Sequence, residues 1–276
     1  MDIMKLLKDI CYSVREEVTK LGKKEANEAY GIGAGGDIAR KIDLVAESKA
    51  IEVIKKYDVR CTLLSEEAGI VNLGNDTQKS EGTIVLDAID GTTNALRGLP
   101  IYSCSIAYAT SDTLSSVEYA AVINIPSGDI YYAIKGDGAY MNNSRLSNYG
   151  SYSNSNGSTY SIGKGYVIGV NVSGIDEDKL GRLRHILTKT NHVRQLGSNA
   201  LELCFIASGL LDAYIDIRGK IRVTDIAAAY LILKEAGGII VDDYANELDA
   251  KLDISNRLSY IAAANKHVLT DILAYL

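Results

Sequence analysis

Residues 83–94 form the stretch Thr83-Ile84-Val85-Leu86-Asp87-Ala88-Ile89-Asp90-Gly91-Thr92-Thr93-Asn94. Its first four residues form an apolar, largely β-branched run, which is typical of a buried strand. Two carboxylates, Asp87 and Asp90, follow where we expect that strand to end. Gly91 permits a tight turn, and the residues after it are common at helix starts. The stretch therefore predicts a strand, a turn and a helix, with oxygen ligands for a metal beside backbone N–H groups that can bind a phosphate.

Three further acidic residues lie at the end of a predicted strand or the start of a predicted helix: Asp43, Glu66 and Asp225. Singly, Asp43 and Asp225 would be interpreted as helix caps, and Asp-x-x-Asp-Gly as a turn. Five carboxylates that converge on one point need cations, however, because like charges at short range raise one another's pKa. Mg²⁺ prefers such oxygen ligands and commonly accompanies phosphate substrates. Their joint occurrence therefore predicts a Mg²⁺ site.

The composition is that of a globular protein. The chain has 276 residues, of which 47% are hydrophobic and 23% charged, enough for one large or two smaller domains. A net charge of −6 argues against nucleic acid or an anionic membrane surface as a partner. No apolar run reaches the ~20 residues of a membrane span, and charged residues interrupt the N-terminus, so we expect a cytoplasmic protein. The four cysteines and three histidines are scattered, which predicts buried thiols and neither a zinc site nor a Ser-His-Asp triad.

Periodicity predicts helices at residues 3–21, 44–57, 177–187, 198–208, 225–236 and 267–276, with Thr224 capping the fifth of these. Strands are predicted at residues 59–64, 83–86, 101–109, 117–125, 129–134, 166–172, 213–217, 239–241 and 260–263. The Ser-, Asn-, Tyr- and Gly-rich segment at 146–161 is the best linker candidate. We therefore predict two halves: 1–146 would carry most metal ligands, and 147–276 would carry Asp225.

A glycine-rich segment, Gly31-Ile32-Gly33-Ala34-Gly35-Gly36, matches the dinucleotide pattern Gly-x-Gly-x-x-Gly. That fingerprint must follow a strand and open a helix, and residues 24–30 lack a strand pattern. We therefore expect a mobile loop that acts as a lid, and no nucleotide site.

Three linked motifs resemble those of the inositol monophosphatase family: Leu64-Ser65-Glu66-Glu67, the stretch Asp87–Asn94, and Thr224-Asp225 followed by Glu235-Ala236-Gly237-Gly238. Their order and spacing match over nearly the whole chain. The glycine-rich loop and the run from Asp216 to Asp225 look most like the archaeal branch, which often combines inositol-1-phosphatase and fructose-1,6-bisphosphatase activity. The resemblance implies an α/β (α+β) fold, a layered αβαβα sandwich of the fructose-1,6-bisphosphatase type. It also implies hydrolysis of sugar or cyclitol phosphate monoesters with two or three Mg²⁺ ions, for which Mn²⁺ can substitute, and a homodimer or higher homo-oligomer.

The resemblance further implies roles for individual residues. One metal would be held by Glu66, Asp87 and the Ile89 carbonyl, a second by Asp87, Asp90 and Asp225, and a third would face Asp43 and Glu66. Phosphate would be bound by Asp90, Gly91 and Thr92. Catalysis is assigned to Asp43, Thr92 and Glu66, with Asp43 and the Thr92 hydroxyl positioning and deprotonating the attacking water.

Two positions depart from the family pattern without removing a ligand: Ala88 replaces a usual proline, and Thr224 a usual aromatic residue. A third, Arg218, stands seven residues before Asp225, where animal inositol phosphatases have an acidic residue. Arginine there suits a second phosphate, which predicts that Arg218 binds substrate. It could instead pair with Asp216 or with a neighbouring acidic group, for example at a subunit interface.

Two other functions stay open. A nucleotide phosphatase acting on 3′-phosphoadenosine phosphates is disfavoured by one Phe and no Trp, although 18 Tyr leave base stacking possible. A metal-dependent sugar-phosphate binding protein without turnover is disfavoured by the set Asp43, Glu66 and Thr92, because a binder needs no water-activating pair.

Overall fold

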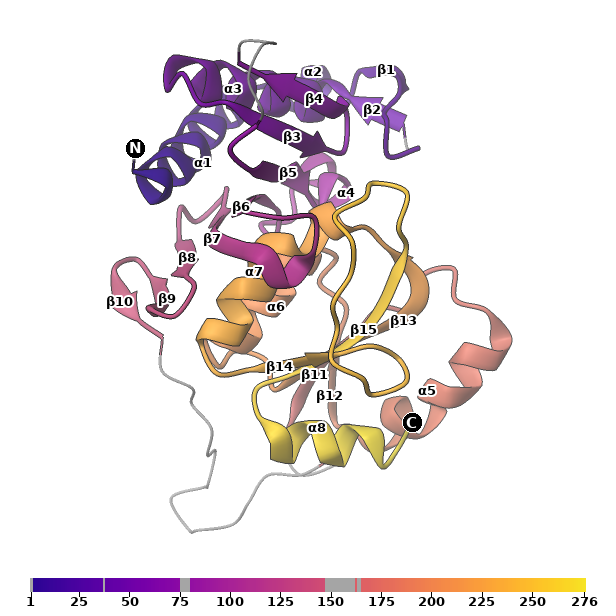
Figure 1. Cartoon of the computed structure of the whole chain (residues 1–276). Coiled ribbons are helices and arrows are strands. Elements are labelled where there is room, and N and C mark those ends of the chain that lie inside the picture. Colours follow the sequence, from indigo (N-terminus) through magenta and orange to yellow (C-terminus); the bar gives the residue numbers. More distant parts are fainter. Residues whose placement is uncertain (1, 37, 75–79, 147–161, 163–164) are drawn as a thin grey trace.

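Two β-sheets alternate with three layers of helices through the molecule (Figure 1). The computed structural model describes residues 2–36, 38–74, 80–146, 162 and 165–276. The layers run helix, sheet, helix, sheet, helix, which confirms the predicted αβαβα sandwich. Within these ranges no helix is both long and apolar enough to cross a membrane.

The larger sheet has eight strands in the order β10-β9-β8-β7-β6-β5-β3-β4. Neighbours pair antiparallel except for β3 and β5, which are parallel. Its strands are β3 (Cys61–Ser65), β4 (Gly69–Leu73), β5 (Thr83–Asp90), β6 (Ser103–Ala109), β7 (Val117–Asn124), β8 (Ile130–Ile134), β9 (Gly138–Met141) and β10 (Ser144–Arg145).

Two long helices, α1 (Ile3–Thr19) and α3 (Lys41–Lys56), cover one face of this sheet. The apolar stripe of α1 is buried at Leu6, Leu7 and Ile10, as the helical spacing predicts. Shorter elements near these helices are α2 (Lys23–Ala26) and a hairpin of β1 (Ala29–Ile32) and β2 (Ile38–Arg40).

The smaller sheet has five strands in the order β12-β11-β13-β15-β14. They are β11 (Val167–Val170), β12 (His192–Arg194), β13 (Ala213–Ile221), β14 (Ile239–Val241) and β15 (Leu258–Ala263). The outer helices α5 (Glu177–Lys189) and α8 (Lys266–Leu273) share a core with this sheet. Elements of both sheets share another core with the middle helices α6 (Asn199–Ala207) and α7 (Val223–Glu235).

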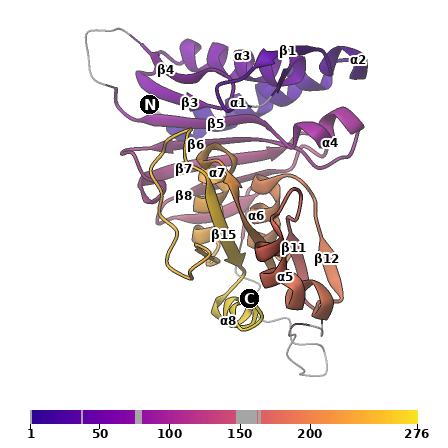
Figure 2. The same ribbon diagram turned by 90° about the vertical axis from the view of Figure 1, so that its right-hand side faces the viewer.

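The middle layer explains why α7 is so apolar. Figure 2 shows α7 and α6 directly against the larger sheet. Every residue of α7 from Val223 to Leu233 is buried, since neighbouring elements cover the helix on all sides. The layer brings Asp225, near the start of α7, next to the larger sheet.

Several boundaries differ from the sequence prediction. The strand predicted to end at Leu86 continues to Asp90 as β5, with irregular pairing between Asp87 and Asp90. The N-cap of α7 is Arg222, so the prediction of Thr224 as the cap was wrong. The pattern also missed short or edge elements: α2, β1, β2, β4, β9, β10 and β12, together with α4 (Thr92–Arg97) beyond its start and the 3₁₀ turn Leu114–Ser116.

The predicted linker lies almost entirely outside the described residues, which resume after 146 with residue 162. The division into halves 1–146 and 147–276 therefore stays a prediction. All four cysteines are buried free thiols, as predicted.

Candidate active site

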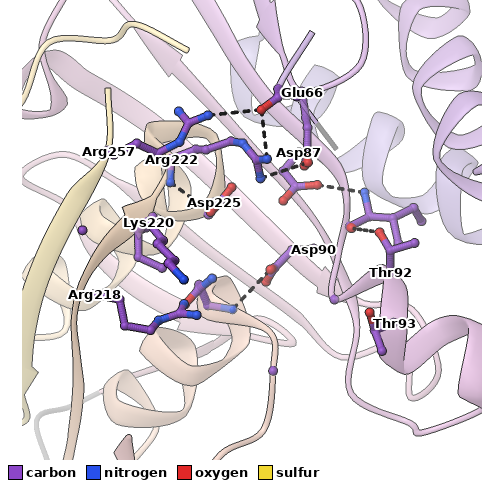
Figure 3. Close-up of a pocket in the computed structure, with 18 residues that line it drawn as sticks. Glu66, Asp87, Asp90, Thr92, Thr93, Arg218, Lys220, Arg222, Asp225 and Arg257 are labelled. Carbon is purple, nitrogen blue, oxygen red and sulfur yellow. Dashed lines mark hydrogen bonds and ion pairs between the residues drawn. The ribbon is translucent and has the colours of Figure 1, made fainter. Parts of the chain in front are cut away.

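A cavity of about 750 Å³ lies where β5, α4, the end of β13 and the starts of α6 and α7 meet (Figure 3). Its wall contains four of the five predicted carboxylates, and also Ile89, Gly91, Thr92 and Arg218. The structure thus gathers most of the predicted site residues around one space. Asp43 is not in the wall, but it contacts it through Thr92.

Three carboxylates form the acidic centre of the cavity. Glu66, Asp87 and Asp225 each place one carboxylate oxygen within 4.8 Å of the others. Glu66 follows β3, Asp87 lies in β5, and Asp225 is the third residue of α7. Asp87 Oδ1 also accepts a hydrogen bond from the Ile89 N–H at 3.1 Å, which fixes the turn after it.

The electrostatics of this centre favour a cation. Burial and the neighbouring Asp225 raise the pKa of Glu66 to about 8. Burial and the charge of Glu66 also raise the pKa of Asp87 well above its usual value. Mutually repelling, buried carboxylate oxygens are a donor set that suits a hard divalent ion, so the residues fit the expected metal.

Asp43 and Thr92 are in direct contact. The Thr92 hydroxyl lies 2.8 Å from Asp43 Oδ1 and 3.1 Å from the Ile89 carbonyl oxygen. The other oxygen of Asp43 accepts the N–H of Arg40 at 3.0 Å and caps α3. Asp43 therefore caps a helix, which is the alternative that the sequence left open, and it also lies beside the cavity. Burial raises the pKa of Asp43, and the bond from Thr92 opposes that rise.

Asp225 combines two roles in the same way. Its Oδ2 accepts the N–H of Arg222 at 3.0 Å and caps α7, and its Oδ1 accepts the Thr224 hydroxyl at 3.2 Å. One of its oxygens also belongs to the acidic centre. Asp43 and Asp225 are thus each the last residue of an Arg-x-x-Asp sequence, and the arginine of that sequence is the N-cap of the helix.

Asp90 is held by the start of α6. Its carboxylate accepts the N–H groups of Asn199 at 3.2 Å and Ala200 at 2.8 Å, and the Ser198 hydroxyl. A helix N-terminus stabilises a negative charge, yet burial still raises the pKa of Asp90 to about 7. Asp90 lines the cavity but lies outside the group of Glu66, Asp87 and Asp225. Its role as a metal ligand stays a prediction.

Gly91 begins α4 with a φ of 93°. A Cβ at this position would lie 3.1 Å from the Gly197 carbonyl oxygen and 3.2 Å from that of Ile101, so both the backbone angle and the packing require glycine. The first N–H groups of a helix have no partner within the helix. The predicted phosphate contacts of Gly91 and Thr92 are compatible with this geometry.

The glycine-rich loop lies against the acidic centre. Gly35 N–H donates to the Glu66 carbonyl at 2.7 Å, and Ala34 N–H donates to that of Glu67 at 3.0 Å. A short strand, β1, does precede the loop, contrary to the sequence prediction. Strand β2 follows it, however, and the two pair antiparallel, so the loop lacks the strand–helix context of a dinucleotide site. Its motion as a lid stays a prediction.

Sequence reasoning missed two arginines at this loop. Arg222 Nη1 lies 3.1 Å from Glu66 Oε1, and Arg222 and Arg257 each donate to the Gly35 carbonyl at 3.1 Å. A Cβ at Gly35 would lie 3.0 Å from both Arg222 and Glu66. The shared Arg-x-x-Asp sequence was the only local signal for Arg222.

Arg218 makes the alternative pairing that the sequence left open. Its Nη2 and Nε lie 2.6 and 2.9 Å from the two oxygens of Asp216, and Nη1 donates to the Ser173 carbonyl at 3.0 Å. The Arg218 side chain is 11% exposed and lines the cavity. Contact between Arg218 and substrate stays a prediction.

Two buried glutamates outside the cavity wall hold backbone segments next to the site. Glu202 Oε1 accepts the N–H groups of Leu196 and Gly197, both at 3.0 Å. Glu47 accepts the N–H groups of Glu67 and Ala68 at 3.2 and 2.9 Å. The only sequence signal was an acidic residue within a predicted helix, which does not identify its partners.

Residues 3–276 match the inositol monophosphatase family. A fructose-1,6-bisphosphatase/inositol-1-monophosphatase of Methanothermobacter thermautotrophicus is 36% identical over 89% of this chain and 85% of its own length. A bifunctional NADP phosphatase/NAD kinase of Methanococcus maripaludis is also 36% identical over 95% of this chain, but the chain spans only 47% of that protein. A solved inositol monophosphatase–fructose 1,6-bisphosphatase superimposes with a TM-score of 0.81 at 30% identity, covering 100% of both chains. With the predicted motifs gathered around one cavity, these matches show that the chain belongs to the inositol monophosphatase family.

Proposed function

We propose that the protein is a metal-dependent phosphatase that hydrolyses sugar or cyclitol phosphate monoesters, with fructose-1,6-bisphosphate and inositol-1-phosphate as substrates. The observation that carries this proposal is the acidic centre of Glu66, Asp87 and Asp225 in the cavity that Thr92 also lines. Cation-binding oxygens and a hydroxyl–carboxylate pair thus lie together. The names of the archaeal relatives support the same activity.

The metal proposed for this site is Mg²⁺, in two or three ions. Glu66, Asp87 and Asp225 would hold it first, with the Ile89 carbonyl and Asp90 as further ligands. When bound, such ions supply Lewis acidity that stabilises charge on phosphoryl oxygens and lowers the pKa of water.

The chain's own groups would act on water and phosphate. Thr92 and Asp43 would orient the attacking water, and Asp43 would accept its proton. Burial raises the pKa of Asp43, which makes it a stronger base than an exposed aspartate. The N–H groups of Gly91 and Thr92 would bind the phosphate oxygens.

A phosphate-release assay with and without chelator tests the proposal. We expect turnover of both substrates with Mg²⁺, none in excess chelator, and recovery when Mg²⁺ is restored. Undiminished turnover in chelator would overturn the metal requirement, and no turnover of any phosphate monoester would overturn the enzyme.

NADP is the second candidate substrate, because a relative of equal identity is named an NADP phosphatase. None of the described residues of the cavity wall is aromatic, so none of them offers a stacking partner to a nucleobase. We therefore place sugar phosphates first and include NADP in the same assay.

The cytoplasmic location and the homodimeric or higher homo-oligomeric state expected from the sequence belong to this proposal. Light scattering of the purified protein tests the oligomeric state.

A further inference from the structure

The Asn199 side chain lies in the cavity wall but takes no part in the metal, water and phosphate contacts proposed above. Asn199 is the first residue of α6, and its backbone N–H donates to Asp90 Oδ1 at 3.2 Å. We propose that the Asn199 amide is a specificity-determining group that donates a hydrogen bond to a hydroxyl oxygen of the leaving group. This inference rests on the proposed function, and it adds a residue that selects polyol phosphates over esters whose leaving group has no hydroxyl.

A buried tyrosine behind the cavity wall holds one end of the Asn199 amide. The Tyr214 hydroxyl donates to Asn199 Oδ1 at 3.0 Å. Tyr214 is 1% exposed, and its ring packs against the ring of Tyr260 with the two centroids 5.6 Å apart. A Cβ at Gly169 would clash with the Tyr214 ring at 2.6 Å, so the backbone also approaches this ring closely. The hydroxyl that holds the amide is therefore fixed by core packing.

A second amide determines the direction of this hydrogen bond. Asn171 Oδ1 accepts the Ser173 N–H at 3.1 Å, so the NH₂ group of Asn171 is the end that can face Tyr214. Burial raises the pKa of the Tyr214 hydroxyl, and a hydrogen bond from the Asn171 side chain opposes that rise. The Tyr214 oxygen thus accepts a hydrogen bond from Asn171, and its single proton goes to Asn199 Oδ1.

The NH₂ group of Asn199 is consequently available to a ligand in the cavity. Asn199 Oδ1 is taken by Tyr214, and among the residues that the structure describes Asn199 Nδ2 has no hydrogen-bond partner. An amide NH₂ group donates and does not accept, so it suits an oxygen acceptor such as a hydroxyl. A ligand without an oxygen at this place would cover the donor and leave it unpaired, which costs affinity.

The place and the chemistry of this donor suit the leaving group better than the phosphate. Phosphate is expected at the N–H groups of Gly91 and Thr92, which begin α4, whereas Asn199 approaches the cavity from α6. A neutral amide also supplies no counter-charge, which a phosphate dianion requires and a hydroxyl does not. The amide therefore fits an oxygen of the sugar or cyclitol.

The test compares Asn199→Ala on two kinds of phosphate monoester. One is fructose-1,6-bisphosphate or inositol-1-phosphate, whichever the unmodified protein hydrolyses better, and the other is cyclohexyl phosphate, whose leaving group has no hydroxyl. Alanine keeps the N–H that Asp90 accepts, so only the side chain is removed. For the polyol phosphate kcat/KM should fall about three- to tenfold, the effect of one neutral hydrogen bond. For cyclohexyl phosphate it should not fall; if turnover is too slow to measure, the inhibition constant supplies the comparison.

Tyr214→Phe tests the positioning of the amide. Without the hydroxyl the Asn199 amide can rotate, so kcat/KM for the polyol phosphate should fall by a smaller factor than in Asn199→Ala, and kcat/KM for cyclohexyl phosphate should stay unchanged. Tyr260→Phe is the matched control. Tyr260 is also fully buried and packs against Tyr214, but its hydroxyl has no hydrogen-bond partner among the described residues and it does not line the cavity. This control should retain kcat/KM for both substrates.

Equal losses on the two substrates in Asn199→Ala would assign the amide to the phosphate or to the position of Asp90, and would overturn the inference. A lower Tm with unchanged kcat/KM would show that Asn199 serves only as a partner for Tyr214, and would overturn it as well. A loss in Tyr260→Phe as large as that in Tyr214→Phe would remove the positioning role of the hydroxyl. These results leave the phosphatase intact, whereas an unmodified protein that hydrolyses no phosphate monoester would show that the proposed function itself is wrong.

Discussion

Replacing Glu202 with leucine should damage the site although Glu202 does not line the cavity. Glu202 is fully buried, and its Oε1 accepts the N–H groups of Leu196 and Gly197, both at 3.0 Å. That turn leads into Ser198, whose hydroxyl holds Asp90. Leucine removes the acceptor and leaves the two N–H groups without a hydrogen-bond partner. The turn should therefore shift, and Asp90 should move with Ser198.

The magnitude follows from two opposing effects. Each buried donor left without a partner costs about 1–3 kcal/mol, so two cost about 2–6 kcal/mol. Glu202 Oε2 is buried and has no hydrogen-bond partner among the described residues, so its removal offsets part of this free-energy cost. We expect a net loss of about 2–3 kcal/mol in unfolding free energy, or a Tm lower by about 4–12 °C at 2–4 °C per kcal/mol. A shift of about 1 Å at Asp90 can lower kcat about a hundredfold.

Thermal melts and steady-state kinetics of three variants test this reasoning. Glu202→Gln keeps one acceptor oxygen and should stay close to the unmodified protein in Tm and kcat. Glu235→Leu is the matched control, since Glu235 accepts the N–H groups of Gly136 at 2.8 Å and Gly138 at 3.0 Å but lies outside the cavity wall. It should lower Tm and leave kcat unchanged. Unchanged kcat in folded Glu202→Leu, or an equal loss in Glu202→Gln, would refute a positioning role.

Three further predictions concern the metal, the pH and the hydroxyl. Asp225→Asn should abolish Mg²⁺-dependent turnover without lowering Tm in chelator, because it relieves repulsion and keeps a capping oxygen; a large drop in Tm would make Asp225 only a structural cap. In chelator, stability to urea should fall as pH rises from about 5 to 8. The folded-state pKa values of Glu66 and Glu202 are about 8, above the reference value of 4.5. Protonation of these groups therefore stabilises the fold fully below pH 4.5, and this stabilisation is lost as the pH rises through 8. Urea midpoints that rise over this range would contradict the prediction. Thr92→Val should lower kcat about a hundredfold, since it removes the hydroxyl that Asp43 orients, while the rise in Tm on adding Mg²⁺ persists; kcat within a few fold of normal would exclude the hydroxyl from catalysis.

The sequence predicted those parts of the fold that depend on local patterns. The apolar stripe of α1 lies buried as its spacing predicts, and β5 and α4 occur where the apolar run and the threonines place them. Edge strand β4 was missed because an apolar residue, Ile70, is 65% exposed on it, so the strand lacks a clear alternation of apolar buried and polar exposed residues.

Local sequence patterns do not predict contacts between distant segments of the chain. Arg222 and the Gly35 carbonyl lie 187 positions apart, and Asp90 lies 109 positions from the Asn199 N–H that it accepts. Spacing could suggest that carboxylates converge, but not that a helix start would hold Asp90. For Arg218 the sequence left substrate, Asp216 and a neighbouring acidic group open as partners. Asp216, two residues away and fully buried, is the partner that it takes, because a buried carboxylate needs a nearby cation.

The acidic centre depends on a core that both predicted halves build together. Val85 and Val122 of the larger sheet belong to one apolar cluster with Ile226 and Tyr230 of α7. Burial of each such side chain contributes roughly 1.5–3 kcal/mol, so this cluster fixes α7 on the sheet. Asp225 lies at the start of α7, and its distance from Asp87 in β5 is therefore set by apolar packing rather than by attraction between the two carboxylates, which repel. Residues 1–146 alone would expose the covered face of the sheet and would lack the third carboxylate.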